Sequence, residues 1–267
     1  MYCVINKEFN RIGLVILLLM MQPCQAGIYF WTDDQGKKHF SDTKHPSASE
    51  YQQSQHISFY SIKTIYDGDT VQLEDGRKIR LAGINTPEIA HRNNRAQEGG
   101  DAAKQWLTQV LSASKVRLKF SEQKQDKYKR YLAHLFTEKG IHINLELVKR
   151  GYASINIFPP NIAYVDDLLK ASNSAEIKQI GIWQYPSYKT KLASELNPNN
   201  KQGWQRIVGK VIKIKRTKKN VYLIMSDTFK LQIKKQFLEY FSKINDLKGK
   251  KVEARGWVNK HKKQYLM

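Results

Sequence analysis

The fold is decided by two neighbouring stretches of sequence, Asp67-Gly68-Asp69-Thr70-Val71-Gln72-Leu73 and Lys78-Ile79-Arg80-Leu81-Ala82-Gly83. Apolar and polar residues alternate in both, and Asp75-Gly76 stands between them. Asp-Gly pairs between alternating runs are the usual signal for a tight turn that joins two antiparallel strands. Together with the alternating run 57–66 that precedes them, these stretches predict three strands of a meander.

The residues that follow predict further elements of the same domain. Residues 96–111 have helical apolar spacing, and 142–150 and 164–180 read as two more helices. Strand character returns at 116–120 and 131–136. Five strands and three helices are therefore expected between residues 56 and 184, in a domain that is mainly β with helices.

Three motifs in this region carry the residue types that phosphodiester hydrolysis needs. They are Asp67-Gly68-Asp69-Thr70, Arg80-Leu81-Ala82-Gly83-Ile84-Asn85-Thr86-Pro87-Glu88 and Asp126-Lys127-Tyr128-Lys129-Arg130. Carboxylates with a hard cation can activate water and neutralise charge at phosphorus, and arginines can stabilise the leaving oxygen. In order and spacing the motifs resemble the staphylococcal nuclease (thermonuclease) family. The resemblance runs from about 57 to 183 and implies an OB-fold barrel of five strands with helices packed against it.

The resemblance also implies which residues form the site. The metal positions, for Ca²⁺ in this family, fall on Asp69, Asn85 and the backbone carbonyl of Thr86. The catalytic positions fall on Arg80, Glu88 and Arg130, with Glu88 as the general base and each arginine presenting a planar fork to phosphate oxygens. The substrate-binding positions fall on Tyr128, Lys129 and Phe158.

The sequence departs from the family pattern at three of these positions. Asn85 replaces an aspartate, so one formal negative charge is lost and calcium affinity should fall. Lys129 stands where the motif commonly has glycine, and it either disfavours a positive-φ turn or adds a phosphate contact. A second pocket tyrosine, expected near 157–158, is missing, and Phe158 can stack on a base but offers no hydroxyl.

The N-terminus predicts a secretory signal over residues 1–26. Lys7 and Arg11 precede the apolar run 12–21, and small residues lead to cleavage after Ala26. Ten apolar residues are too few for a permanent membrane anchor. Cys3 and Cys24 are the two cysteines of the chain and lie in this segment. The mature chain would then have neither a disulfide nor a cysteine-based zinc site or nucleophile.

Residues 27–55 are expected to form a small domain with a β-hairpin and a polar linker. The hairpin is predicted by two aromatic-rich runs around a turn with Gly36. Its W-x-D-x-x-G-x-x-H-F-S-D pattern resembles a small uncharacterised domain of exported proteins from Gram-negative bacteria. We expect His39 to be structural rather than a ligand.

The C-terminal part is expected to be a second, basic domain. After a polar linker at 185–203, residues 204–267 contain 18 Lys and Arg against four acids, and thus +14 of the formal net charge of +21. Strands are predicted at 206–215, 220–225, 229–234, 250–258 and 264–267, and a helix at 236–244. This order is OB-like. Such charge implies a polyanionic partner, DNA, RNA or an anionic envelope surface, although surface lysines can also serve solubility alone.

Two functional hypotheses follow from the sequence. The first is an exported, calcium-dependent nuclease, monomeric and periplasmic or secreted, that hydrolyses DNA and RNA with low sequence specificity. The resemblance implies release of the 5′-oxygen and 3′-phosphate ends. The second is a nucleic-acid-binding protein whose nuclease-like barrel has lost its metal, which Asn85 and the basic C-terminal domain favour.

Overall fold

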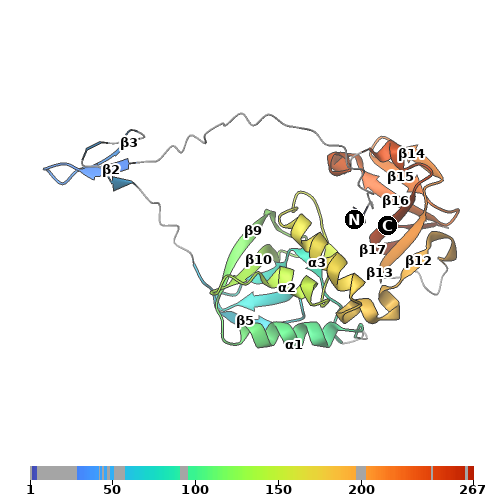
Figure 1. The fold of residues 1–267 in the computed structure, drawn as a ribbon, viewed down its shortest axis with the longest axis horizontal. Coiled ribbons are helices and arrows are strands. Elements are labelled where there is room, and N and C mark those ends of the chain that lie inside the picture. The colour runs from blue at the N-terminus through green and yellow to red at the C-terminus, as the bar shows by residue number, and fades with distance from the viewer. Residues whose placement is uncertain are drawn as a thin grey trace. The chain divides into compact units, whose positions relative to one another are not determined.

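A computed structural model gives the architecture of the chain. It describes residues 2–4, 29–41, 43, 45–46, 49–50, 58–90, 96–196, 203–241, 243–261 and 264–267. The chain divides into two compact units, one of which holds residues 7–57 and the other residues 1–6 and 58–267. The larger unit contains two sheets of many strands with three α-helices (Figure 1).

The first barrel is built from five strands. These are β5 (Ile62–Ile65), β6 (Thr70–Leu73), β7 (Lys78–Leu81), β9 (Val116–Gln125) and β10 (Tyr131–Thr137). Their order in the sheet is β5-β6-β7-β10-β9. Backbone hydrogen bonds in both directions between Tyr60 and Val116 join the residues before β5 to β9 and bring the two ends of this order together. The sheet thus has the OB-fold strand order, and the predicted fold class is confirmed.

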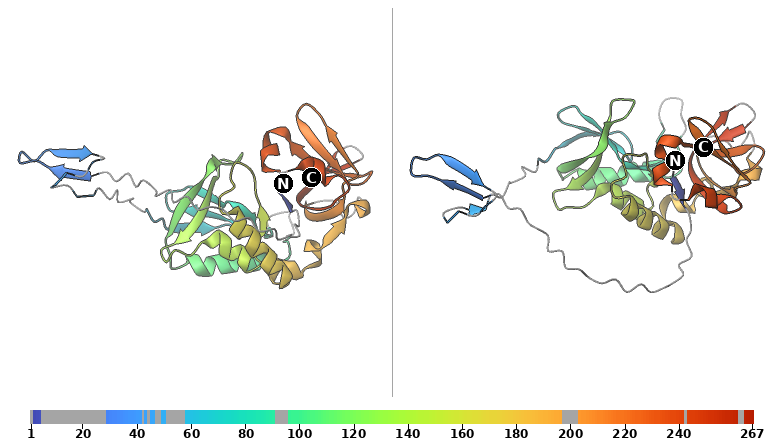
Figure 2. Two further views of the ribbon diagram at one scale, coloured as in Figure 1. Left: turned by 45° about the horizontal axis from the view of Figure 1, so that its top comes forward. Right: turned by 90° about the horizontal axis from the view of Figure 1, so that it is seen from above.

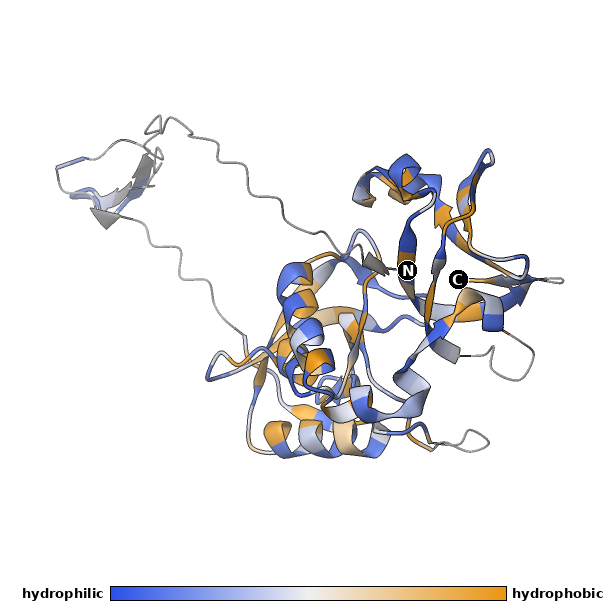
Figure 3. Ribbon diagram, turned by 45° about the vertical axis from the view of Figure 1, so that its right-hand side comes forward, coloured by the Kyte–Doolittle hydropathy of each residue, from blue (hydrophilic) through white to orange (hydrophobic). Residues whose placement is uncertain are grey.

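Three α-helices lie around this barrel (Figures 1 and 2). They are α1 (Gly100–Leu111), α2 (Ile143–Lys149) and α3 (Val165–Ile177). Apolar residues from helices and strands form one core, in which Leu107, Leu147 and Leu168 are fully buried. Colouring by hydropathy shows how polar and apolar residues alternate along the strands and around the helices (Figure 3).

A small two-stranded sheet extends the barrel in a way that we did not predict. Strand β8 (Gly83–Asn85) continues from β7 and pairs antiparallel with β11 (Ser154–Asn156). The Ser154 hydroxyl donates to the Asn85 carbonyl over 3.1 Å. This pairing holds the backbone at the end of β8, where the candidate site begins.

The second barrel has the same strand order. Its strands are β13 (Gly203–Lys210), β14 (Lys213–Arg216), β15 (Asn220–Ile224), β16 (Phe229–Lys234), β17 (Lys251–His261) and β18 (Gln264–Leu266). Strands β13 and β14 are two halves of one bent strand, because only Val211 and Ile212 separate them. One half pairs with β17 and the other with β15, and β18 joins β17 to β16. The predicted OB-like order is therefore present, and the short β18 fills the last place in it.

Two details of this region differ from the prediction. The residues expected to form a helix at 236–244 form the 3₁₀-helix η4 (Lys235–Tyr240) and, after it, η5 (Ile244–Leu247). The predicted linker is in part structured, because η2 (Pro186–Tyr188), β12 (Thr190–Leu192) and η3 (Ala193–Glu195) lie in it. Strand β12 pairs in parallel with β13 and so becomes an edge of the second sheet.

An ion-pair ring joins α3 to the second barrel. Glu176 of α3 pairs with Arg206 of β13 and, over 2.8 Å, with Arg255 of β17. Both arginines also pair with Glu253, over 2.9 and 2.7 Å. Their guanidinium groups lie over the ring of the buried Trp183, 5.4 and 5.6 Å from its centroid.

The smaller unit contains the predicted hairpin. Strands β2 (Tyr29–Thr32) and β3 (Lys38–Ser41) pair antiparallel, and β4 (Ser49–Glu50) pairs with β2. His39 stacks on Trp31 and lies 2.7 Å from a carboxylate oxygen of Asp33, which supports a structural role for this histidine.

In the larger unit, β1 (Tyr2–Val4) pairs antiparallel with β17.

Most of the predicted signal segment, 5–26, lies outside the described residues. Among the helices that the structure describes, none is both long and apolar enough to cross a membrane.

Candidate functional site

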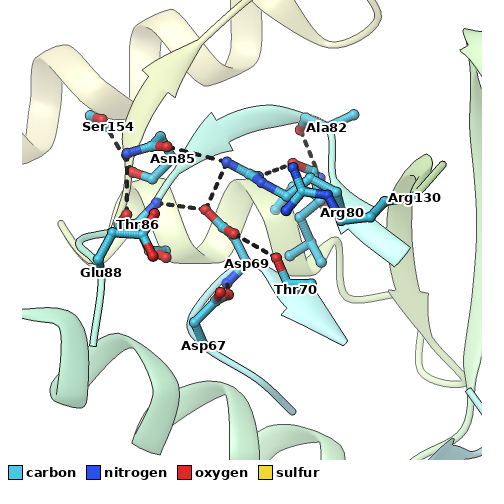
Figure 4. A network of polar contacts seen from close by, with 12 residues as sticks. Asp67, Asp69, Thr70, Arg80, Ala82, Asn85, Thr86, Glu88, Arg130 and Ser154 are labelled. Atoms are coloured by element: carbon cyan, nitrogen blue, oxygen red, sulfur yellow. Dashed lines mark hydrogen bonds and ion pairs between the residues drawn. The ribbon is translucent and has the colours of Figure 1, made fainter. Parts of the chain in front are cut away.

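The site begins at Asp69, whose buried carboxylate stands just before β6 (Figure 4). Its Oδ2 accepts the backbone N–H of Thr86 over 2.9 Å, and its Oδ1 accepts the Thr70 hydroxyl over 3.1 Å. This packing requires the glycine before it. A Cβ on Gly68 would lie 2.6 Å from the Cβ of Ala103 and 2.8 Å from a methyl carbon of Thr86. Gly68 therefore lets the Asp-Gly-Asp turn approach α1 and the Thr86 loop closely.

Arg80 links the predicted metal and phosphate positions. It lies on β7, and its Nη2 is 2.9 Å from Oδ2 of Asp69 and 3.2 Å from Oδ1 of Asn85. Its Nη1 donates to the Leu81 carbonyl over 2.7 Å. Oxygens of two predicted metal ligands thus converge on one cationic nitrogen.

Asn85 and Thr86 end the β8 strand and are both buried. The Asn85 amide uses both of its ends, since Oδ1 accepts from Arg80 and Nδ2 donates to the Thr86 carbonyl over 3.1 Å. An aspartate in this place could not donate to that carbonyl. The Asn85 side chain therefore occupies the Thr86 oxygen that the resemblance assigns to the metal.

Glu88 lies at the start of the next loop and points into the same region (Figure 4). Burial and the charge of Asp69 raise the pKa of the Glu88 carboxyl, and the charges of Arg80 and Arg130 oppose that rise. The loop is held by Gln97, whose backbone N–H donates to the Glu88 carbonyl over 2.8 Å. A Cβ on Gly100 would lie 2.7 Å from that same carbonyl oxygen, so the first residue of α1 must be small.

Arg130 is fixed by a carboxylate four residues earlier. Its guanidinium donates to Oδ2 of Asp126 over 2.8 Å from Nε, and the pair is 2.7 Å apart at Nη2. Burial raises the pKa of the Asp126 carboxyl, but hydrogen bonds from the Arg130 backbone and side chain outweigh this and hold the pKa below its usual value. Lys129, in the turn between them, has a φ of 62°, so this lysine adopts the left-handed conformation that favours glycine.

Two of the predicted substrate residues are exposed aromatic side chains. Tyr128 is 67% exposed, and the centroid of its ring lies 5.4 Å from the guanidinium carbon of Arg130. Phe158 is 56% exposed, and its loop is tied to β9 by Asn161, which exchanges hydrogen bonds with the backbone of Gln123. Asp69, Arg80, Asn85 and Thr86, by contrast, contact one another directly.

Asp67 and Asp126 belong to this region although the sequence analysis gave neither of them a role. The Asp67 carboxylate accepts the Asp69 backbone N–H over 2.9 Å. Burial, together with the nearby charge of Asp69, raises the pKa of Asp67 to about 6. The spacing of four residues between Asp126 and Arg130 was a usable signal, but Asp67 was hidden by the ordinary turn function of its Asp-Gly pair.

The oxygen donors of the site can be set against the needs of a divalent cation. Within the described residues, no group of three or more His, Cys, Asp or Glu side chains is placed to hold a metal ion. A metal would depend on Asp69, the amide oxygen of Asn85 and the Thr86 carbonyl, which are all oxygen donors. Such a set fits a hard cation such as Ca²⁺, with fewer charges than a strong calcium site has.

Comparison with known proteins agrees with this geometry. Residues 78–185 match the family described as staphylococcal nuclease homologue. The thermonuclease of Staphylococcus intermedius is 34% identical over 128 residues, which cover 47% of this chain and 76% of that protein. This chain belongs to the staphylococcal nuclease family. The predicted family and the enzyme class, a nuclease, are thereby confirmed.

Each of the other matches to this staphylococcal nuclease family member covers only one part of the chain. The thermonuclease of Staphylococcus hyicus is 32% identical over 127 residues, which cover 46% of this chain and 75% of that protein. Endonuclease YhcR of Bacillus subtilis is 34% identical over 134 residues, which are 46% of this chain and 11% of YhcR. Residues 15–55 match a domain of unknown function, DUF4124.

Proposed function

We propose that this chain is a calcium-dependent nuclease that hydrolyses the phosphodiester bonds of DNA and RNA with little sequence preference. One observation carries the proposal. Arg80 lies within 3.2 Å of oxygens of both Asp69 and Asn85. Glu88 lies close enough to Arg80 and Arg130 for their charges to act on the pKa of its carboxyl. One small region of the first barrel therefore contains a candidate base, two guanidinium groups that can bind phosphate and a set of oxygen donors.

The side chains divide the reaction between them. Glu88 accepts the proton of the attacking water, and Arg80 and Arg130 bind the phosphate oxygens on which negative charge grows in the transition state. The water oxygen bonds to phosphorus as the bond from phosphorus to the 5′-oxygen breaks. The departing 5′-oxygen takes up a proton, and the phosphate stays on the 3′ end. A bound Ca²⁺ would add positive charge at the phosphate and help to orient it. Asp69, Asn85 and the Thr86 carbonyl are the residues that would hold it.

The test is digestion of single- and double-stranded DNA and RNA by the chain from Gly27, with calcium, magnesium or a chelator. We expect cleavage with calcium and a loss of about 10²-fold or more in Glu88→Gln and Arg80→Ala, the range typical for removing a general base or a charge-stabilising donor. The matched control is Glu122→Gln, an exposed carboxylate on β9. Unchanged hydrolysis in both site variants would refute the assignment.

Asn85 favours a second candidate, a nucleic-acid-binding protein without catalysis. Its Nδ2 hydrogen bond engages the Thr86 carbonyl, and its Oδ1 bond engages Arg80. Asp69 also pairs with Arg80, so all three oxygen donors already have partners within the protein. Salt-sensitive DNA binding with no cleavage in calcium or magnesium, in wild type and in Asn85→Asp alike, would support this candidate.

We further propose that the chain is exported, to the periplasm or the medium, as a monomer, after cleavage at Ala26. The sequence of its first 26 residues supports this. N-terminal sequencing of the protein from the periplasm and the medium of an expressing Gram-negative cell tests the proposal. A cytoplasmic product that begins at Met1 would refute it.

A further inference from the structure

One face of the second barrel presents lysines around an aromatic ring. Buried residues Val221 and Leu223 on β15 and Leu231 and Ile233 on β16 point into the core. Because side chains alternate along a strand, the residues between them point outwards. These outward residues on β15 and β16, with their neighbours on β14, form what we call the lysine–tyrosine face: Lys213, Lys215, Asn220, Tyr222, Ile224, Lys230, Gln232 and Lys234.

The strand register places these side chains in rows. Lys215, Tyr222 and Gln232 are abreast on the three strands, and Lys213, Ile224 and Lys230 form the next row. The Lys230 ammonium lies 5.1 Å from the centroid of the Tyr222 ring. The Tyr222 hydroxyl accepts a hydrogen bond from Asn220 over 3.3 Å, which helps to fix the ring. The ring is partly exposed and is flanked by two lysines.

This face and the turns beside it carry an excess of positive charge. Residues 213–235 contain eight Lys and Arg and one acid, Asp227. None of these eight cations forms an ion pair with a carboxylate in the part of the chain that the structure describes. The buried arginines of the same barrel, Arg206 and Arg255, differ, since both pair with Glu176 and Glu253. Residues 213–235 therefore carry +7 of the net charge of +14 that residues 204–267 have.

We propose that the lysine–tyrosine face binds single-stranded nucleic acid, with a base stacked on Tyr222 and phosphates on Lys213, Lys215 and Lys230. An exposed ring between cations matches the alternation of base and phosphate in a single strand. The bases of a duplex are stacked on one another and cannot reach the ring. This inference rests on the proposed function for its choice of a nucleic acid over another polyanion. It adds a second binding site, separate from the carboxylates of the first barrel.

The binding experiment uses fluorescence anisotropy of a labelled oligo(dT) with the full chain from Gly27. All variants carry Glu88→Gln and are measured in a chelator, so that the probe is not cut and the first barrel contributes little. We expect Tyr222→Ala to weaken binding about tenfold, the usual range for one stacked base, and Tyr222→Phe to bind as the parent does. Tyr240→Ala is the matched control, since Tyr240 is 41% exposed in the same barrel but lies outside this face.

The cations are tested by the salt dependence of the same binding. The triple variant Lys213→Gln, Lys215→Gln, Lys230→Gln should lower the slope of log affinity against log salt by about 2, at about 0.7 for each phosphate of the single strand that is no longer neutralised. The control triple Lys248→Gln, Lys250→Gln, Lys251→Gln removes the same charge from exposed positions elsewhere in the barrel and should change the slope less. Equal effects of the two triples would overturn the proposed site.

A crosslinking experiment keeps the proposal testable if Tyr222→Ala fails to fold. Oligonucleotides with 5-iodouracil are irradiated with the Glu88→Gln protein, and the crosslinked peptide is mapped. Attachment at Tyr222 or within 213–234 supports the site, and attachment confined to the first barrel overturns it. If the lysine triple abolishes binding to phosphatidylglycerol vesicles but leaves oligo(dT) affinity unchanged, the partner is a membrane and the proposal is wrong.

The two proposals fail separately. Without cleavage by the wild-type chain, the nuclease proposal falls while binding at Tyr222 can still be measured. With cleavage but equal oligo(dT) affinity in Tyr222→Ala and the parent, this face is not the site while the nuclease stands.

Discussion

Nη2 of Arg80 lies 2.9 Å from Oδ2 of Asp69, so an arginine that we propose to bind phosphate forms an ion pair with the one carboxylate among the predicted metal ligands. Asn85 takes part through its amide oxygen, 3.2 Å from the same nitrogen. A cation bound by these oxygens has to displace the guanidinium from both. We therefore expect the charge at position 85 to influence how strongly a cation competes with Arg80.

Asn85→Asp should raise calcium affinity about tenfold or more. The substitution adds a formal negative charge to the donor set and removes the hydrogen bond from Nδ2 to the Thr86 carbonyl. Calorimetric titration with Ca²⁺ in the absence of substrate measures the affinity directly. An unchanged affinity would mean that residue 85 is not a ligand. Asn156→Asp, on the paired strand β11, is the control for a general charge effect.

Gly100→Ala should lower hydrolysis about tenfold or more without lowering stability by a comparable amount. Alanine favours a helix by up to about 1 kcal/mol over glycine, but its Cβ would stand 2.7 Å from the Glu88 carbonyl oxygen and must push that loop away. Single-turnover cleavage together with urea unfolding separates the two effects. Gln105→Ala, at an exposed position of the same helix, should leave cleavage unchanged.

Lys129→Gly should stabilise the protein by about 0.5–1 kcal/mol, because a non-glycine residue at a φ of 62° is strained by about 1–2 kcal/mol and glycine recovers part of this. Urea unfolding at neutral pH measures the change. Lys127→Gly removes the same charge from the same turn, at a position outside the left-handed region, and is expected to be neutral or destabilising. Equal effects of the two substitutions would remove the conformational explanation.

Stability should fall as the pH is lowered below about 6.5, because the buried His134 and the half-buried His142 are held in their neutral form. Nδ1 of His134 lies 3.1 Å from Nε2 of His142, and burial is the main cause that lowers their pKa values to about 3 and about 4. Below about 6.5 the unfolded chain binds protons that the folded chain does not, so each histidine costs up to about 1.4 kcal/mol per pH unit.

The comparison that isolates this effect is urea unfolding of wild type and His142→Phe between about pH 7 and pH 5, on the acid side of the usual histidine pKa. The phenylalanine keeps a ring beside Phe136, on which His142 stacks, and removes one titrating group. Asp67, with its pKa of about 6, acts in the opposite direction, since its raised pKa makes the folded state gain stability as the pH falls. It is present in both proteins and cancels in the difference. An equally steep loss in both would exclude His142 as a cause.

Glu176→Ala should destabilise the protein by about 2–4 kcal/mol, since it leaves two mostly buried arginines with one carboxylate, Glu253. Trypsin should then cut between α3 and β13 more readily. Glu146→Ala is the matched control on another helix, because its pairs with Lys149 and Arg150 are exposed and worth less than about 1 kcal/mol.

The sequence predicted local structure well where residues close in the chain decide it. Strand β16 has the predicted bounds, and the Asp75-Gly76 turn joins β6 to β7 as expected. The run 236–244 was predicted wrongly as one helix. Here Lys243, in a left-handed conformation with φ of 56°, separates two 3₁₀-helices, and a helical apolar spacing contains no sign of that break.

Contacts of the candidate site follow from the sequence only where the two partners lie on adjacent strands or in one turn. The contact between Asp69 and Arg80 joins adjacent strands, so the meander implies it. The hydrogen bond from Ser154 to Asn85 joins residues 69 positions apart, and the ion pairs of Glu176 cross from a helix to another barrel. Such contacts depend on tertiary packing, which no local pattern encodes.

Strand β18 sets the order in which the two barrels can form during synthesis. Its three residues, Gln264–Leu266, provide the pairing both to β16 and to β17, whereas every strand of the first barrel lies before residue 138. Before these residues leave the ribosome, the first barrel can already fold. In the second barrel, β16 and β17 then each have an unpaired edge. Unpaired edges promote association between chains. Loss of these three residues alone would therefore open two strand edges of the second barrel at once, while every strand of the first barrel kept its partners.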